Sequence, residues 1–353
     1  MGIVYGLIAL VIIILIHESG HFSVAKLFHI YVERFSIGFG PAILRKKGKE
    51  TEYVISAIPL GGYVKLKGEN PEEGEKESLD ERAFCNQKLY KRFLVILAGP
   101  MFNILSAVLF FAVVYAVGVP TLTSTIGKVN KDTPAYYAHL QKDDKIIAIN
   151  NKSIKTWEEL SNIIKRNAEK TIILKIKRNE KIIETPVTPK LTKIKDLLGY
   201  EKEVGIIGIT PSGETIIQRL NVFKSIGKGA CRTAYIVKIT ILGIIRLIER
   251  AIPASSVGGP ILIIDIASKA ASAGFSTFLA LAAIISINLG ILNLLPIPIL
   301  DGGHLTFLTI EAIRRKPVPL NVQVVAQNIG LAILILIMVF AFYNDLSRIF
   351  IKK

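Results

Sequence analysis

The sequence has little charge, few aromatic residues and almost no cysteine. Charged residues make up 20% of its 353 residues, aromatic residues make up 8%, and there are two cysteines. A mean hydropathy of +0.46 excludes both an ordinary soluble protein and a disordered one. Because Cys85 and Cys231 cannot build a disulfide framework, we expect both to be free thiols.

Acidic residues are scarce relative to basic ones. The chain has 28 Asp and Glu against 44 Lys and Arg, which gives a formal net charge of +16. The basic residues are mixed with acidic ones in segments that flank apolar runs, and the sequence has no RNA-recognition motif or zinc-finger spacing. This pattern is typical of the loops of a membrane protein, so we expect a lipid bilayer as partner and no nucleic acid.

Four apolar runs are long enough to cross a bilayer. A signal peptide is the competing interpretation of the first run, but that run has neither a positive start nor a small-residue cleavage site. Arg232, Lys238 and Arg246 interrupt the apolar pattern of segment 212–272, which favours amphipathic interfacial helices, with a fifth span within 223–272 as the alternative. The predicted spans cover 1–28, 93–120, 273–304 and 318–343.

Lys and Arg near the ends of the spans predict the orientation. They place segment 29–92 and the loop 305–317 in the cytoplasm. Four spans then put both termini, including the tail 344–353, outside the cytoplasm. The sequence therefore predicts a multi-pass protein of the inner (cytoplasmic) membrane.

Two polar segments have β character. Within 29–92, the stretch 52–66 is β-branched and apolar and is broken at Pro59-Leu60-Gly61-Gly62, which indicates a hairpin associated with the membrane. Segment 121–211 alternates short strand patterns with one helical pattern and is long enough for one small α+β domain. The fold class is thus a polytopic α-helical membrane protein of about four transmembrane helices, with a membrane-associated β-hairpin insertion and one extracytoplasmic α+β domain. In the second segment, strands are expected at 126–129, 146–150, 171–177 and 181–185, and a helix at 157–164.

The first apolar run contains a His-Glu-x-x-His motif. On a helix, His17 and His21 share one face and can bind the same Zn²⁺, while Glu18 can act as general base toward a water molecule in peptide-bond hydrolysis. Ionisable groups inside an apolar span are costly, so they need a partner or a function. The motif therefore predicts a zinc hydrolase site within the membrane.

A catalytic zinc site needs a third protein ligand. Asp301 is the lone acid in a long apolar run, and Pro296 and Pro298 should break the helix just before it. His304, three residues later, is the alternative ligand or a hydrogen-bonding partner of the ligands. The pattern favours Asp301 over His304 and leaves both open.

These residues resemble the site-2 protease family of intramembrane zinc metalloproteases. The resemblance covers nearly the whole chain, and the segment 121–211 is similar to a PDZ domain, so the chain resembles a single-PDZ form. The motifs that carry the likeness are His17-Glu18-x-x-His21, residues 35–41, 59–65 and 98–103, and Asn293-x-x-Pro296-x-Pro298-x-Leu300-Asp301-Gly302.

The resemblance implies a set of roles for individual residues. It implies that His17, His21 and Asp301 bind zinc and that Glu18 is the catalytic acid and base. The element with Gly61 and Gly62 would pair with a substrate helix as it unwinds. For Asn288, a polar contact between packed helices is an equally good interpretation. Further substrate-binding residues implied are Asn293, Asn288, Pro296 and Pro298.

The resemblance also implies a class of substrate. The expected substrates are single-span membrane proteins already shortened by another protease, such as anti-sigma factors or remnant signal peptides, cleaved in regulated intramembrane proteolysis. Segment 204–209 of the PDZ-like domain favours a closing strand, with a loop whose N–H groups bind the C-terminus of a partner peptide as the alternative. Two other hypotheses are an ion-coupled transporter with Glu18, Asp265 and Asp301 as a relay, and an inactive PDZ scaffold.

Overall fold

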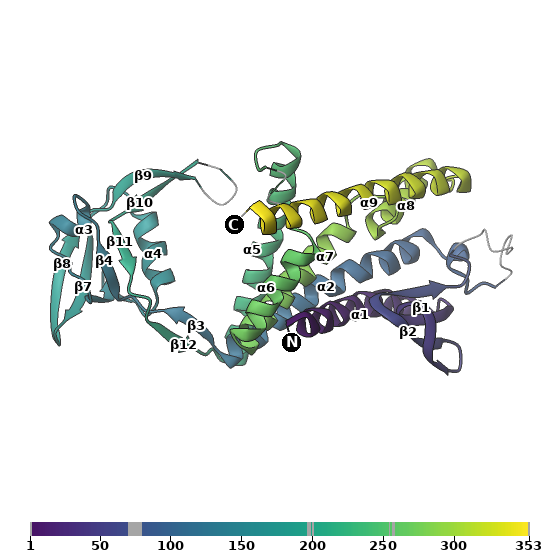
Figure 1. The fold of residues 1–353 in the computed structure, drawn as a ribbon, viewed down its shortest axis with the longest axis horizontal. Helices are drawn as coiled ribbons and strands as arrows, with labels where there is room; N and C mark the ends of the chain where they lie inside the picture. Colours follow the sequence, from purple (N-terminus) through teal and green to yellow (C-terminus); the bar gives the residue numbers. More distant parts are fainter. Residues whose placement is uncertain are drawn as a thin grey trace. The chain divides into compact units, whose positions relative to one another are not determined.

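A computed structural model describes residues 2–69, 80–195, 199, 201–253, 255 and 258–351. The chain divides into two compact units. The first, the helical unit, contains residues 1–114, 222–245 and 253–353, and the second, the α/β unit, contains residues 115–221 and 246–252. Figure 1 shows the elements of both units.

The helical unit contains the candidate membrane spans. Among the described residues, four helices are long and apolar enough to cross a bilayer, at Gly6–Leu27, Leu89–Val117, Phe275–Asn293 and Leu320–Arg348, in agreement with the number predicted. Helix α5 is as long as a span but has a basic residue every few positions, and it is not among these candidates. The helices are α1 (Gly2–Leu27), α2 (Leu89–Val117), α5 (Val222–Ile248), α6 (Pro260–Ser272), α7 (Phe275–Asn293), α8 (Asp301–Arg314) and α9 (Leu320–Ile351).

The third predicted span is two helices rather than one. Helix α7 ends at Asn293 and α8 begins at Asp301. Between them lie Pro296 and Pro298, which lack a backbone N–H and clash with the preceding turn of a helix. The prolines therefore end the span where the sequence suggested, and Asp301 becomes the first residue of a new helix.

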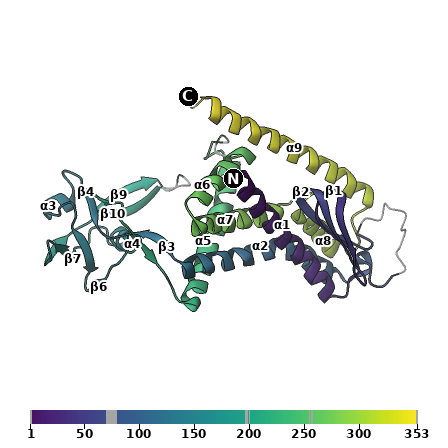
Figure 2. The ribbon, with the colours of Figure 1, turned by 60° about the horizontal axis from the view of Figure 1, so that its bottom comes forward.

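The predicted hairpin within 52–66 is wrong in its pairing. Strand β2 (Glu52–Leu66) does not fold onto itself; both of its halves pair with β1 (Val32–Lys47). Ile37 lies opposite both Gly62 and Ile55. The two strands therefore form a sheet of four neighbouring strand segments, in the order 62–66, 32–37, 52–58 and 42–47. Positive φ angles at Gly38 and Gly40 let β1 bend between its two halves. Figure 2 shows the strands beside α1, with which they are in contact.

The α/β unit closely follows the sequence prediction. Its main sheet has the strand order β6-β5-β7-β8, formed by β5 (Lys145–Ile149), β6 (Lys152–Ser153), β7 (Ile172–Arg178) and β8 (Lys181–Val187). Helix α4 (Trp157–Arg166) is capped at its N-terminus by Thr156, whose hydroxyl accepts a hydrogen bond from the Glu159 N–H. Ile146, Leu160 and Leu174 are fully buried in its core. The remaining elements are α3 (Pro134–Tyr137) and the strand pairs β3 (Val119–Leu122) with β12 (Thr215–Gln218), β4 (Ile126–Val129) with β11 (Ile209–Pro211), and β9 (Lys190–Lys195) with β10 (Glu201–Ile206).

An ion-pair cluster fastens the turn between β1 and β2 to the helices. Arg82 donates two hydrogen bonds to the Glu50 carboxylate, at 2.9 and 3.0 Å, and a third to the His29 carbonyl. Lys26, near the end of α1, donates to the same carboxylate at 2.9 Å. The hydrogen bonds from Arg82, and to a smaller extent the one from Lys26, lower the pKa of Glu50 to about 2. The turn is thus held by a carboxylate that must stay ionised.

We predict that this attachment weakens in acid. Because the pKa of Glu50 is lower in the folded protein than its ordinary value of 4.5, its contribution is fully present above that value and is lost as the pH falls through about 2. Corrected amide exchange at residues 48–51 should therefore speed up between about pH 4.5 and pH 2. In Glu50→Gln the exchange should be fast at pH 6 already, whereas Glu81→Gln should behave as wild type. Equal pH dependence in wild type and Glu50→Gln would contradict this assignment.

Candidate metal centre

The two histidines of the motif lie one helical turn apart on α1 and point at each other. Their Nε2 atoms are 3.2 Å apart, and the His17 side chain is almost fully buried. This is the arrangement expected for i and i+4 positions on a helix.

Asp301 completes the cluster from the start of α8. Its carboxylate oxygens lie 3.0 Å from His17 Nε2 and 3.6 Å from His21 Nε2. One ligand atom from each of the three residues falls within 4.8 Å of the others. The structure therefore brings together the three residues that the motif and the lone acid indicated.

The spacing of these atoms fits a zinc ion. Ligand atoms about 2.0–2.1 Å from a tetrahedral zinc lie roughly 3.3 Å from one another, close to the 3.2 Å between the two histidine Nε2 atoms and the 3.0 Å between His17 Nε2 and Asp301 Oδ2. Asp301 Oδ2 is buried and has no well-aligned hydrogen-bond donor among the described residues. Two imidazole nitrogens and an unsatisfied carboxylate oxygen are a donor set that zinc prefers.

Helix α2 orients both imidazoles. The Val95 carbonyl lies 2.9 Å from His21 Nδ1, so that nitrogen carries the proton and Nε2 is free to bind a metal. The Asn103 side-chain amide lies 3.2 Å from His17 Nδ1, and its Oδ1 has no partner among the described residues. Turning the amide by 180°, which exchanges two atoms of similar size, makes Oδ1 the acceptor of the His17 Nδ1–H. Asn103 has no role that could be predicted from residue spacing; the signal in the sequence that points to it is its place in the motif at 98–103.

Two glycines allow α1 and α2 to come this close. A Cβ at Gly20 would lie 2.5 Å from the Ala98 carbonyl oxygen, and a Cβ at Gly99 would lie 2.2 Å from His21 Nε2. Either atom would push the helices apart or displace an imidazole. The glycines therefore position the histidines without touching a substrate.

Glu18 lies between the histidines and the β1–β2 element. A Cβ on Gly62 would lie 3.1 Å from the Glu18 Cγ, and Val64 lines the same cavity as Glu18. The strand segment 62–66 thus runs directly past the glutamate. Gly61 turns the chain with a φ of +129°, under the ring of Phe39.

The other predicted site residues fall into two groups. Asn293, the last residue of α7, points its amide to 3.2 Å from His17 Nε2, and Pro296 and Pro298 lie in the break before Asp301. Asn288 instead accepts a hydrogen bond from Thr240 of α5 at 2.9 Å, the helix contact that was the alternative interpretation. Of the proposed relay, Asp265 pairs with Lys269 on α6 at 2.7 Å.

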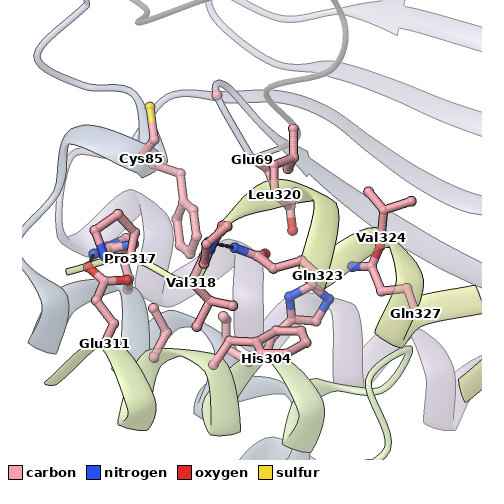
Figure 3. A pocket seen from close by; sticks show the side chains of 17 residues that line it. Glu69, Cys85, His304, Glu311, Pro317, Val318, Leu320, Gln323, Val324 and Gln327 are labelled. Carbon is pink, nitrogen blue, oxygen red and sulfur yellow. Dashed lines mark hydrogen bonds and ion pairs between the residues drawn. The ribbon is translucent and has the colours of Figure 1, made fainter. Parts of the chain in front are cut away.

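Two adjoining cavities surround the centre. The metal cavity, of about 220 Å³, is lined by the three candidate ligands, Glu18, Asn293 and the strand segment 62–66. A second cavity of about 640 Å³ lies between α2, α8 and the start of α9. Glu69, Ile96 and His304 line both cavities. Figure 3 shows His304 and Gln323 pointing into the second cavity, which is also lined by the partly buried ion pair of Arg92 and Glu311. His304 therefore stands between the cavities, and Asp301 is the residue that joins the histidines.

A helix with a His-Glu-x-x-His motif and a carboxylate as the third metal ligand, set among four apolar helices, defines a metal-dependent hydrolase of the membrane. The chain belongs to peptidase family M50, whose family model matches residues 5–337. It is therefore a zinc metallopeptidase, and the predicted membership of the site-2 protease family is confirmed.

Two relatives that match nearly the whole chain also have names that describe zinc metalloproteases. A Campylobacter jejuni protein named "Putative zinc metalloprotease Cj1068" is 37% identical over 96% of this chain and 91% of its own length. A Clostridium acetobutylicum protein named "Putative zinc metalloprotease CA_C1796" is 36% identical over 98% of this chain and 97% of its own length. Among solved structures, the PDZ domain of an SdrC-like protein from Listeria monocytogenes is 22% identical, over 26% of this chain and 90% of that domain, with a TM-score of 0.21.

We predict that Gly99→Ala abolishes the metal centre. The added Cβ would occupy the position of His21 Nε2, so zinc content should fall roughly tenfold or more and proteolysis with it, as measured by elemental analysis and cleavage. Gly227→Ala is the matched control, because a Cβ there meets nothing within 4 Å. Replacing Gly by Ala stabilises a helix by about 1 kcal/mol, so helix propensity alone predicts no loss of zinc in either variant. Normal zinc content in Gly99→Ala would contradict the steric role of the glycine.

Proposed function

We propose that this protein hydrolyses peptide bonds in or near the transmembrane segment of single-span membrane proteins that another protease has already shortened. Such substrates include anti-sigma factors and remnant signal peptides, and the process is regulated intramembrane proteolysis. The observation that carries the proposal is the three-residue metal centre among apolar helices, with Glu18 and a strand beside it. A cleavage site at this place can be reached by a peptide that lies within the bilayer.

The proposed chemistry divides the work between the metal and Glu18. His17, His21 and Asp301 would hold the zinc, which when bound acts as a Lewis acid toward the scissile carbonyl and toward water. Glu18 takes the proton of the attacking water and returns it to the leaving amine. Gly62 of the strand segment 62–66 lies against the Glu18 side chain beside the centre. The Asn293 amide, close to His17, is placed to donate a hydrogen bond to the substrate carbonyl.

The strand segment 62–66 is the proposed site where the substrate unwinds. A helix hides its scissile carbonyl, whereas an extended peptide paired with a strand exposes it. The segment pairs with 32–37 on one side and lines the metal cavity. Gly62 lets this strand lie against Glu18, since a Cβ there would come within 3.1 Å of the Glu18 Cγ, and Gly61 lets the chain turn under the ring of Phe39.

Hydrolysis in an apolar bundle also needs a supply of water. The second cavity is lined by polar groups, among them Arg92, Glu311 and Gln323, and shares Glu69 and His304 with the metal cavity. We infer that water reaches the centre from this side. The lining of the second cavity includes residues of the segments 29–92 and 305–317, such as Arg92 and Glu311, which the distribution of Lys and Arg assigns to the cytoplasm.

The same distribution supports the proposed orientation. Both termini and the α/β unit would lie outside the cytoplasm of the inner membrane, and the α/β unit would act as a PDZ-like domain that binds a peptide C-terminus at segment 204–209. That segment contains the end of β10 and the start of β11.

We predict that Glu18→Gln keeps zinc but does not cleave. Removing the carboxylate leaves the three ligands intact and should lower the rate at least a hundredfold, because the proton acceptor is lost. His17→Ala and Asp301→Ala should lose both zinc and activity. The measurement is cleavage of a single-span model substrate by purified protein in detergent, with zinc content determined on the same samples.

Cleavage by zinc-loaded Glu18→Gln at the wild-type rate would overturn the catalytic assignment. Cleavage of soluble peptides in preference to every single-span substrate would overturn the substrate class and leave the metal centre standing.

A further inference from the structure

The sheet formed by β1 and β2 extends beyond the helix on which it packs. Residues that pair in the register of a sheet point to the same face. Phe35 and Tyr53 are such a pair, and both rings contact Phe22 of α1, with 5.3 and 6.1 Å between ring centroids. On the same face of the two outer strand segments, Leu44 is 62% exposed and Ile55 is 46% exposed, so α1 leaves this part of the sheet uncovered. We refer to four residues of this face as the overhanging strip: Leu44, Lys46, Tyr53 and Ile55.

Contacts with α1 set the depth of the overhanging strip in the bilayer. Its surface end, at Tyr53, is level with Phe22, whose ring it contacts. Its inner end, at Ile55, is level with Glu18, because Gly62 stands at the same register two segments away and lies against the Glu18 side chain. Two strand residues cover about 6.6 Å and four helix residues about 6 Å, so the two contacts are consistent. The candidate span ends just over one turn beyond Phe22, so the inner end lies within the bilayer and the surface end lies close to the headgroups.

The surface end of the strip has positive charge without acidic partners. Lys46 is the register partner of Tyr53 and is exposed. Glu50 and Glu52, which follow in the sequence, are already engaged in ion pairs with other basic residues. A lysine at this depth can extend its ammonium group to the headgroups while its stem covers apolar surface. In the part of the chain that the structure describes, no acidic side chain pairs with the basic residues of this run: Arg45, Lys46, Lys47 and Lys49.

The charge of this edge argues against a second copy of the chain as its occupant. An outermost strand presents backbone groups with which another strand can pair. An antiparallel copy would place the basic run 45–47 against itself, and like charges opposite each other destabilise a strand pair. The exposed Tyr53 hydroxyl has no hydrogen-bond partner among the described residues. Apolar residues, a hydroxyl and basic residues in this order match the acyl chain, the ester and phosphate oxygens, and the negative charge of a phospholipid.

We propose that the overhanging strip binds an anionic phospholipid. One acyl chain lies along Leu44 and Ile55 beside α1, the Tyr53 hydroxyl donates a hydrogen bond to an ester or phosphate oxygen, and the Lys46 ammonium pairs with the phosphate. The four side chains lie on one face of two neighbouring segments, about 5 Å apart across the strands and about 7 Å along them, so one lipid reaches all of them.

The basic run determines which lipid is favoured. A lipid with a net negative charge binds better than a zwitterionic one, because the ammonium group of the latter would meet the basic residues at 45–49. The bound lipid fixes the depth of the sheet, whose opposite edge is the segment 62–66 beside Glu18. This role does not depend on the chemistry at the metal centre.

The single tryptophan of the chain allows a direct test. Trp157 belongs to the α/β unit, so Trp157→Phe leaves the helical unit without a tryptophan. Leu44→Trp then places one fluorophore on the overhanging strip and keeps that position apolar. Leu336→Trp is the matched reporter, at a 70% exposed position of the candidate span in α9.

The measurement is fluorescence quenching in phosphatidylcholine nanodiscs. Increasing fractions of acyl-brominated phosphatidylglycerol or acyl-brominated phosphatidylcholine are added, and the quenching curves give the relative association constant of the two lipids at each reporter. Neither metal content nor proteolysis enters the readout.

We expect the Leu44→Trp reporter to favour phosphatidylglycerol about threefold or more, and the Leu336→Trp reporter to give a ratio of about one. In the Leu44→Trp protein, Lys46→Gln should reduce the ratio to about one, whereas Lys46→Arg should keep it. Arg45→Gln removes the same charge one residue away, on the other face of the sheet, and should retain most of the preference. A ratio of one at position 44, or equal losses in Lys46→Gln and Arg45→Gln, would overturn the proposal.

The hydroxyl has its own test. Tyr53→Phe should weaken quenching at position 44 by both lipids about twofold or more, because ester and phosphate oxygens are common to them. Unchanged quenching by both lipids in Tyr53→Phe would contradict the hydrogen bond and with it the seating of the lipid. Weak quenching at position 44 by both lipids, with strong quenching at position 336, would mean that protein covers this edge and would also overturn the proposal.

Discussion

Charged and polar groups in an apolar helix bundle must satisfy one another, and the helical unit is organised around that constraint. His17, His21 and Asp301 converge from α1 and α8, while Glu18 lies against Gly62 of the strand segment 62–66. Each of these groups alone would be costly at this depth. Together they form a donor set that a zinc ion satisfies, so the centre that performs the chemistry also makes the ionisable residues tolerable.

The helices reach this arrangement through breaks and close approaches. The prolines at 296 and 298 end α7 and allow α8 to start at Asp301, which brings a carboxylate to the histidines. Gly20 and Gly99 remove the side chains that would separate α1 from α2. On the remaining side, the strand segment 62–66 covers Glu18. The proline break, the two glycines and the strand segment thus position the metal ligands and Glu18.

Local spacing made part of this site predictable from the sequence. His17, Glu18 and His21 follow from a single helical turn, and Pro296 and Pro298 marked the break before Asp301. The choice between Asp301 and His304 was open on spacing alone, because it depends on how α8 sits against α1. Asn103, the Val95 carbonyl and Gly99 act across α1 and α2, and contacts of that kind leave no periodic signal in one sequence.

The fold shows the same division between local and distant information. The strands β4, β5, β7 and β8 and the helix α4 were predicted within a residue or two from their apolar patterns, whereas α3 and the strands β3, β6, β9, β10, β11 and β12 were not predicted. The pairing of β1 with both halves of β2 was missed, since 52–66 contains a turn pattern at 59–62 that suggested a self-contained hairpin. Strand partners depend on which segments the glycines at 38 and 40 allow to bend back, and this is a property of the assembled sheet.

The central claim is that His17, His21 and Asp301 are the protein ligands of one zinc ion. The most direct measurement is zinc X-ray absorption on the purified protein together with its Asp301→Asn and His304→Ala variants. We expect two imidazole ligands and oxygen ligands, without sulfur, at about 2.0–2.1 Å. The spectrum should be unchanged in His304→Ala, and zinc should be lost or its coordination altered in Asp301→Asn. A change confined to His304→Ala, or sulfur coordination by Cys85 or Cys231, would contradict the account.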